Sequence, residues 1–427
     1  MLYSKILMSR LSDIIDDVST NSDFIRNPNS DFTRTRKLDF KTTFNTILTM
    51  GGTSLNRELI NLFNFSEGTP TKSAFVQARE KILPHAFSHV FYEFSKKLRR
   101  PKSFKGFKLL AVDGSSVITT KNSCDSEAFV IRNSFTMYNE HVISAMYDLM
   151  NNVYTDAVVQ PVKQKNERGA LISMIPNVLD TSIIIADRGY ESYNVMAHLE
   201  NACQKYVVRV KDINSNGMAS GFGLTGKEFD QTITVNISNF QRKKLKILPN
   251  YRFSPTIARF DFSDESNPVY ALTFRVVRIC LGEGKYQCLV TNLFNGVTVS
   301  DFKRLYAMRW GIETSFRELK YAVGLNNFHS KKKDSIIQEI YASLTLHNFS
   351  ESIVQNTILT TRATKHLYKI DFVMAVETCR QYLRLFNTIL INVEASIVRY
   401  LSVIRDGRSF FRNLKNKSYT SFVYRVS

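Results

Sequence analysis

Two short apolar runs, each followed at once by an aspartate, restrict most strongly what this chain can fold into. Residues 108–112 precede Asp113, and residues 182–186 precede Asp187. Runs of this length, rich in Ile, Leu and Val, predict buried β-strands. Apolar residues at helical spacing between and after them indicate that strands alternate with helices. That alternation predicts an α/β core with helices on the faces of a central sheet.

The chain, at 427 residues, is long enough for more than one folding unit. Helical spacing dominates 39–98, and a basic, proline-containing linker follows at 99–103. We expect five regions: a helical N-terminal region (1–100), the first part of the core (101–211), a β-rich insertion (212–297), the rest of the core (298–360) and a basic helical C-terminal region (361–427).

Individual elements can be expected from the same periodicities. The core should carry further strands at 141–150, 153–162 and 206–210, and helices at 167–179 and 193–203. The insertion should carry strands at 232–237, 258–262 and 270–280, and helices should dominate from about residue 298 to about residue 404.

The charge balance points to a polyanionic partner. The chain carries 57 Lys and Arg against 38 Asp and Glu, a formal net charge of +19, which is typical of proteins that meet nucleic acid or an acidic membrane surface. Residues 101–200 differ, with 9 basic and 11 acidic residues. The basic charge therefore flanks a segment where carboxylates gather.

Several other classes of protein are disfavoured. No stretch reaches the ~18 consecutive apolar residues of a membrane span. The five cysteines are odd in number and scattered, which fits a reducing intracellular compartment and no disulfide framework. Residues 221–228 have part of a P-loop pattern, but Glu228 stands where that loop needs Ser or Thr. His85 and His89 have zinc-compatible spacing without a third ligand, so ordinary helix-face histidines are expected.

The two strand-end aspartates are candidate metal ligands. Side chains at the carboxyl ends of parallel strands project into a common crevice, and Mg²⁺ prefers oxygen ligands. Asp is also frequent at strand ends simply as a turn former. Asp113 and Asp187 alone therefore do not decide between the two interpretations, and a third carboxylate would be needed for a two-metal site.

The segment 306–320 is more specific. As one continuous helix at ~100° per residue, it places four polar side chains within about 60° of each other; these are Tyr306, Arg309, Glu313 and Lys320. A solvated charged face would explain the ions. It would not explain the tyrosine, or why the only tryptophan of the chain, Trp310, lies in the same segment.

The spacing Tyr306-x2-Arg309-x3-Glu313-x6-Lys320 resembles the Y-R-E-K signature of insertion-sequence transposases of the DDE type, often called the IS-four family. The runs at 112–115, 166–168 and 186–190 also look familial, and the resemblance covers roughly 33–425. It implies an α/β fold with a ribonuclease-H-like mixed-sheet core, a mostly β insertion before the final Glu, and helical N-terminal and C-terminal regions.

The resemblance implies cut-and-paste transposition by phosphodiester hydrolysis and strand transfer. Asp113, Asp187 and Glu313 would be catalytic and would hold two Mg²⁺ ions, with Mn²⁺ able to substitute. Arg309 and Lys320 would face phosphates. Tyr306 would bond a phosphate or stack on a base.

Two further residues leave alternatives open. Trp310 is either a stacking surface for a base flipped from the DNA or a core anchor behind the signature helix. Arg188 either contacts a phosphate or only pairs with Asp187.

The implied partners are double-stranded DNA, as terminal inverted repeats and as target, and no membrane. Region 1–100 would bind the DNA ends, with 71–79 either a recognition helix or part of the bundle core. Region 361–427 would mediate a homodimer assembled on DNA, in the cytoplasm of a bacterium and associated with the nucleoid. A stand-alone metal-dependent nuclease of the same fold and a non-catalytic DNA-binding repressor derived from a transposase are the alternatives.

Overall fold

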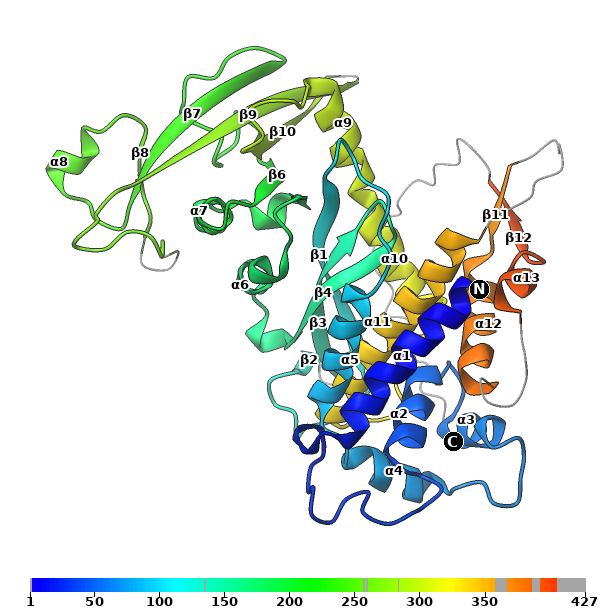
Figure 1. Cartoon of the computed structure of the whole chain (residues 1–427). Coiled ribbons are helices and arrows are strands. Elements are labelled where there is room, and N and C mark those ends of the chain that lie inside the picture. Colours follow the sequence, from blue (N-terminus) through cyan, green and yellow to red (C-terminus); the bar gives the residue numbers. More distant parts are fainter. Residues whose placement is uncertain are drawn as a thin grey trace.

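A single mixed sheet of ten strands runs through the molecule in the computed structural model, with helices packed on it (Figure 1). The structure describes residues 2–133, 136–255, 258, 260–282, 284–357, 367–385 and 392–404. The basic tail beyond residue 404, expected as part of the C-terminal region, lies outside them.

Five strands form the centre of the sheet: β1 (Lys108–Thr119), β3 (Thr136–Asp148), β4 (Val153–Pro161), β5 (Ser182–Ala186) and β6 (Lys205–Val210). Their order is β4-β3-β1-β5-β6. β3 is antiparallel to β1 and β4, whereas β1, β5 and β6 are mutually parallel. This is the ribonuclease-H-like arrangement, and it confirms the expected fold class. The short strand β2 (Phe129–Asn133) extends the β3 edge.

The β-rich insertion extends this sheet. β10 (Lys285–Thr291) pairs antiparallel with β6, and β9 (Tyr270–Gly282), β7 (Phe229–Ser238) and β8 (Tyr251–Phe253) follow outward. With the short helix α8 (Lys243–Lys246), these strands project away from the helical part of the molecule (Figure 1).

The remaining helices cover the core and build a bundle. α6 (Glu167–Met174) and α7 (Tyr193–Asn201) follow β4 and β5. The N-terminal helices are α1 (Tyr3–Thr20), α2 (Phe40–Thr49), α3 (Leu55–Leu62), α4 (Lys72–Glu80) and α5 (Pro84–Lys96). Later in the chain come α9 (Val299–Met308), α10 (Trp310–Tyr321), α11 (Lys333–Asn356), α12 (Phe372–Leu385) and α13 (Val393–Ile397).

Helix α11 is the axis of the bundle. Of its 24 residues, 17 are buried, because it contacts α5, α2, α12 and strand β4 together. Arg79 of α4 joins this interior: it is 1% exposed and its guanidinium bonds Glu339, Gln338 and the carbonyl of Ser335. The helix therefore packs into the bundle, but Arg79 is buried in it, whereas the bundle-core interpretation of 71–79 expected its Lys and Arg side chains to be solvated.

Three expected elements differ from those observed. The helix expected over 167–179 ends at Met174 and continues as a 3₁₀ turn, Ile175–Asn177, because Pro176 cannot continue the α-helix. The described residues of 258–262 lie outside any strand. There, the carbonyl of Phe260 accepts a hydrogen bond from the side-chain amide of Asn239, and not from the backbone of a neighbouring strand. The helical stretch expected to residue 404 also contains a strand pair, β11 (Tyr368–Ile370) with β12 (Leu401–Val403).

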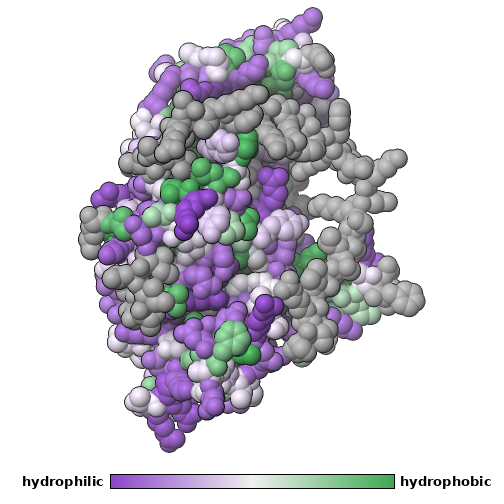
Figure 2. All heavy atoms as spheres, turned by 90° about the vertical axis from the view of Figure 1, so that its right-hand side faces the viewer, coloured by the Kyte–Doolittle hydropathy of each residue, from purple (hydrophilic) through white to green (hydrophobic). Residues whose placement is uncertain are grey.

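The surface is mostly polar on the side turned to the viewer in Figure 2, with apolar residues in small separate groups among hydrophilic ones. Within the described ranges, no helix is both long and apolar enough to cross a membrane.

Candidate active site

The two aspartates lie side by side where two parallel strands part. The parallel pairing of β1 with β5 ends at Val112 opposite Ala186, so Asp113 and Asp187 occupy the next position on each chain. The expectation that the first strand ends at Asp113 is wrong, because antiparallel pairing with β3 carries β1 on to Thr119. Asp187 does end its strand, and its carboxylate accepts the Gly189 N–H at 2.6 Å.

The signature segment is two helices instead of one. α9 ends at Met308 and α10 begins at Trp310. On both sides of Arg309 the backbone hydrogen bonds are of the 3₁₀ type: the Arg309 N–H donates to the Tyr306 carbonyl, and the Ile312 N–H donates to the Arg309 carbonyl. Tyr306 therefore lies on α9, whereas Glu313 and Lys320 lie on α10. Arg309 itself keeps right-handed helical dihedral angles (φ −50°, ψ −32°), so the segment stays helical through this one-residue interruption. Arg309 bonds Glu313 one turn later and lies over the Tyr306 ring, as expected for residues on one helical face.

Arg309 joins the two helices to the acids. Its Nη2 lies 2.7 Å from Glu313 Oε1, and its Nη1 lies 3.7 Å from Asp113 Oδ2. The side chain spans from the acid on α10 to the acid on β1, and it is 6% exposed. The structure thus brings Asp113, Arg309 and Glu313 together at the place where Asp187 also lies.

Burial and neighbouring charges act strongly on Asp113. Burial, helped by the negative charges of Asp187 and Glu313, raises its pKa to about 6, despite the lowering effects of the Gly114 N–H and of Arg309. All three acids are thus within electrostatic range of each other. A carboxyl in this setting needs positive charge nearby to stay ionised at neutral pH.

The remaining predicted residues differ in placement. The Tyr306 side chain is 8% exposed, and the Arg309 guanidinium lies over its ring at 5.6 Å. The Lys320 ammonium donates to the Ser116 carbonyl of β1 at 2.7 Å. The Trp310 side chain is 55% exposed, which excludes the core-anchor interpretation. Arg188 is exposed beside Asp187, and the described structure has no ion pair between them.

A sequence model of a family described as "Transposase DDE domain" matches residues 105–349, more than half of the chain. The chain belongs to the DDE transposase family. No curated protein matches the sequence. Among solved structures, a piggyBac transposase synaptic complex with hairpin DNA is similar in fold. Its TM-score is 0.51 at 10% identity, over 93% of this chain and 81% of that one.

Two further residues of this DDE transposase lie at the acids; both belong to runs that look familial in sequence, 166–168 and 186–190, but neither was predicted as a site residue. Glu167, the first residue of α6, packs over Gly114: a Cβ on Gly114 would stand 2.5 Å from Glu167 Oε1. Tyr190 is 1% exposed, and its hydroxyl has no hydrogen-bond partner among the residues that the structure describes. Burial and the charges of Glu167, Asp113 and Asp187 raise the pKa of Tyr190. The sequence signal for Glu167 was an acidic residue at the start of the helix that lies between β1 and β5.

The donor set fits a hard divalent cation in its chemistry, because all three predicted ligands are partly buried carboxylates. In the part of the chain that the structure describes, no three His, Cys, Asp or Glu side chains are grouped closely enough to hold a metal ion. A cation does already lie between Asp113 and Glu313, namely the Arg309 guanidinium.

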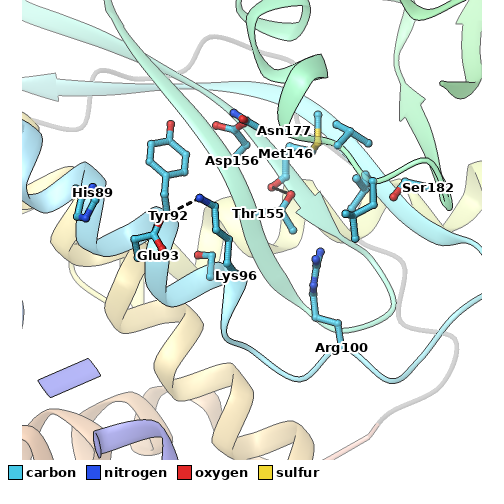
Figure 3. A pocket seen from close by; sticks show the side chains of 14 residues that line it. His89, Tyr92, Glu93, Lys96, Arg100, Met146, Thr155, Asp156, Asn177 and Ser182 are labelled. Atoms are coloured by element: carbon cyan, nitrogen blue, oxygen red, sulfur yellow. Dashed lines mark hydrogen bonds and ion pairs between the residues drawn. The ribbon is translucent and has the colours of Figure 1, made fainter. Parts of the chain in front are cut away.

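A separate pocket of about 290 Å³ lies elsewhere in this transposase chain (Figure 3). Its lining comes from α5, β3, β4 and the segment after α6, and includes Tyr92, Lys96, Asp156 and Asn177. Asn177 donates to Asp156 at 2.9 Å and Lys96 pairs with Glu93 at 2.8 Å. None of the predicted site residues lines it, so the pocket does not belong to the acid site.

Proposed function

We propose that this DDE transposase is the cut-and-paste enzyme of an insertion sequence with a Y-R-E-K signature, of the IS-four type. The observation that carries the proposal is the Arg309 bridge, which holds Glu313 of α10 beside Asp113 of β1, at the parting of strands where Asp187 lies. Two-metal phosphoryl transfer needs carboxylates from distant parts of the sequence at one place, and the electrostatic coupling of Asp113 to Asp187 and Glu313 supports this assignment.

Each residue has a proposed role. Asp113, Asp187 and Glu313 are the catalytic acids and metal ligands. Two Mg²⁺ ions, or Mn²⁺, would supply activation of the attacking hydroxyl group and charge stabilisation at phosphorus. Lys320 fixes α10 against β1 through the Ser116 carbonyl.

The DNA-facing roles fall to four residues. Arg309 and Arg188 take phosphates as positively charged partners. Tyr306, close to Asp187 and under Arg309, orients that guanidinium. Trp310 offers an exposed ring on which an unstacked base can lie; the similar piggyBac complex contains hairpin DNA.

The proposed partners are the terminal inverted repeats and target DNA. The N-terminal helices would bind the ends, and two chains would assemble on a pair of ends as a homodimer. The setting proposed is the bacterial nucleoid. The net charge of +19 supports binding to a polyanion.

The test is cleavage of end DNA in Mg²⁺ by purified protein. Asp113→Ala, Asp187→Ala and Glu313→Ala should each lose on the order of 10³-fold in rate, because each removes a proposed ligand of the cations that stabilise charge at the reacting phosphate. Asp180→Ala, an exposed acid near the second strand, is the matched control and should cleave normally. Normal cleavage by the three variants would refute the site.

The products separate this proposal from its alternatives. Joined products from a target duplex would support transposition. Nicks without joining would identify a stand-alone nuclease, and binding of end DNA with no metal-dependent cleavage would identify a repressor.

A further inference from the structure

The Arg309 side chain occupies the space between two of the acids that should hold metal ions. Its Nη2 bonds Glu313 Oε1 at 2.7 Å and its Nη1 lies 3.7 Å from Asp113 Oδ2. These are the oxygens that a divalent cation would take. A guanidinium and a metal ion cannot both hold the same carboxylate oxygens, because each needs them at close range.

The environment of Arg309 offers it little besides those acids. The residue is 6% exposed, and within the described part of the chain its buried Nε and Nη1 atoms have no hydrogen-bond acceptor. The Tyr306 ring at 5.6 Å adds a weaker attraction. A buried cation with unused donors is costly unless charges of opposite sign compensate it. Asp113 and Glu313 are therefore what keeps Arg309 in place, and a better acceptor such as a phosphate would draw it away.

We propose that Arg309 and divalent cations compete for Asp113 and Glu313, and that a DNA phosphate settles the competition by accepting Arg309. The inference rests on the proposed function, since it assigns a regulatory role to a residue of the same site. Without DNA, Arg309 neutralises the acids and keeps the metal affinity low. With DNA, the guanidinium turns to a phosphate, and the carboxylates become available to metal.

Competition of this kind makes metal and DNA bind cooperatively. By linkage, DNA raises the metal affinity by the same factor by which metal raises the DNA affinity. Removing Arg309 should abolish that coupling and raise the metal affinity measured without DNA. The site would then load metal without substrate, which the wild-type chain avoids.

The experiment titrates the full chain with Mn²⁺, followed by electron paramagnetic resonance, with and without a duplex carrying the terminal inverted repeat. Arg309→Ala should bind Mn²⁺ about tenfold more tightly than wild type without DNA, within the 5–150-fold range of typical couplings. The Mn²⁺ affinity of Arg309→Ala should rise little when DNA is added. Arg309→Lys keeps the charge but cannot reach both acids, so its Mn²⁺ affinity without DNA should lie between those of the wild type and Arg309→Ala. Lys303→Ala removes an exposed cation of α9 and is the matched control.

Each outcome decides a different point. Mn²⁺ affinities that are equal, or weaker, in Arg309→Ala without DNA would overturn the competition. If wild-type Mn²⁺ binding is lost in Asp113→Ala in that same experiment, the proposed function survives. Absence of Mn²⁺ binding in every variant, with and without DNA, would overturn the metal site and the competition together. Circular dichroism of each variant distinguishes misfolding, and Arg309→Lys keeps the test decisive if Arg309→Ala does not fold.

Discussion

At the scale of single residues, the behaviour of the site depends on how costly it is to ionise Asp113. Its carboxyl is partly buried on β1 and faces two other acids. The pKa of about 6 lies well above the usual value of an aspartate. Between its usual pKa and about 6, the folded protein holds a proton on Asp113 that the unfolded chain has already released.

A stability measurement against pH tests this. Between about pH 4 and pH 6 the folded state binds more protons than the unfolded state, so the free energy of unfolding should fall as pH rises, by on the order of 2 kcal/mol. Asp113→Asn has no carboxyl that titrates at this position, so its free energy of unfolding should fall less as pH rises. Urea unfolding at pH 4.5, 5.5 and 7, with a chelator present, measures the difference. Parallel curves for the two proteins would contradict the shifted pKa.

The contact between Gly114 and Glu167 gives a second prediction. A methyl group at Gly114 would stand 2.5 Å from Glu167 Oε1 and 3.0 Å from its Cδ, so Gly114→Ala must displace that side chain. We expect a loss of about 1 kcal/mol in the free energy of unfolding, as for modest overpacking. In a Glu167→Ala background the same substitution should cost nothing. A double-mutant cycle by chemical denaturation gives the coupling, and equal costs in both backgrounds would disprove the contact.

The candidate site residues could be named from the sequence as a prediction, but their contacts could not. The spacing of Tyr306, Arg309, Glu313 and Lys320 carries the family resemblance without any structure. That Arg309 bonds two of the acids, and that Lys320 bonds the Ser116 carbonyl, depends on how α10 meets β1. Helical periodicity says nothing about that meeting.

At the scale of elements, the interruption between α9 and α10 is a departure of one residue from the expected helix, because Arg309 keeps helical dihedral angles. Gly311, a poor helix former, follows closely. A Cβ at Gly311 would stand 2.9 Å from Leu149 Cδ2. Such an approach between a helix and the end of β3 is a tertiary effect that local sequence does not reveal.

The outer end of the insertion carries a basic surface that should contact DNA. Residues 231–260 contain six basic residues and no acid, and Arg242, Lys243, Lys244 and Lys246 are exposed around α8. Lys243→Gln with Lys244→Gln should weaken DNA binding and make the plot of log affinity against log salt shallower by roughly 1–2, at ~0.9 per lost phosphate contact.

Fluorescence anisotropy at several salt concentrations measures that slope. Lys227→Gln with Lys285→Gln removes two exposed charges from the opposite end of the insertion and is the matched control. Equal slopes in the two double variants would show that the α8 surface does not touch DNA.

At the scale of the whole molecule, buried ion pairs connect the N-terminal helices to the later part of the chain. Arg79 of α4 lies 2.9 Å from Glu339 of α11, with side chains 1% and 8% exposed. Arg79→Ala should lower the free energy of unfolding by about 3–5 kcal/mol, because Glu339 is left buried without that partner. Lys72→Ala, on the exposed side of α4, should cost little. A thermal melt compares them, and similar Tm values would contradict the assignment.

The fold class was predictable because strands and helices alternate along the chain, and alternation restricts the architecture. The order of the sheet was not, since the pairing of β6 with β10 joins segments about eighty residues apart in sequence. The insertion was expected as a separate β-rich region, and its continuation of the central sheet follows from that long-range pairing alone.

The central place of α11 has a consequence for how the protein is made. The N-terminal helices end at Lys96, but the helix they pack on ends at Asn356, 260 residues later. At roughly 5–20 residues per second, a ribosome needs roughly 13–52 s to cover that distance. During this time the first helices can pack on one another, but the apolar faces that contact α11 have no native partner. We therefore expect the nascent chain to depend on chaperones, and its output of active protein to fall steeply when chaperone capacity is short.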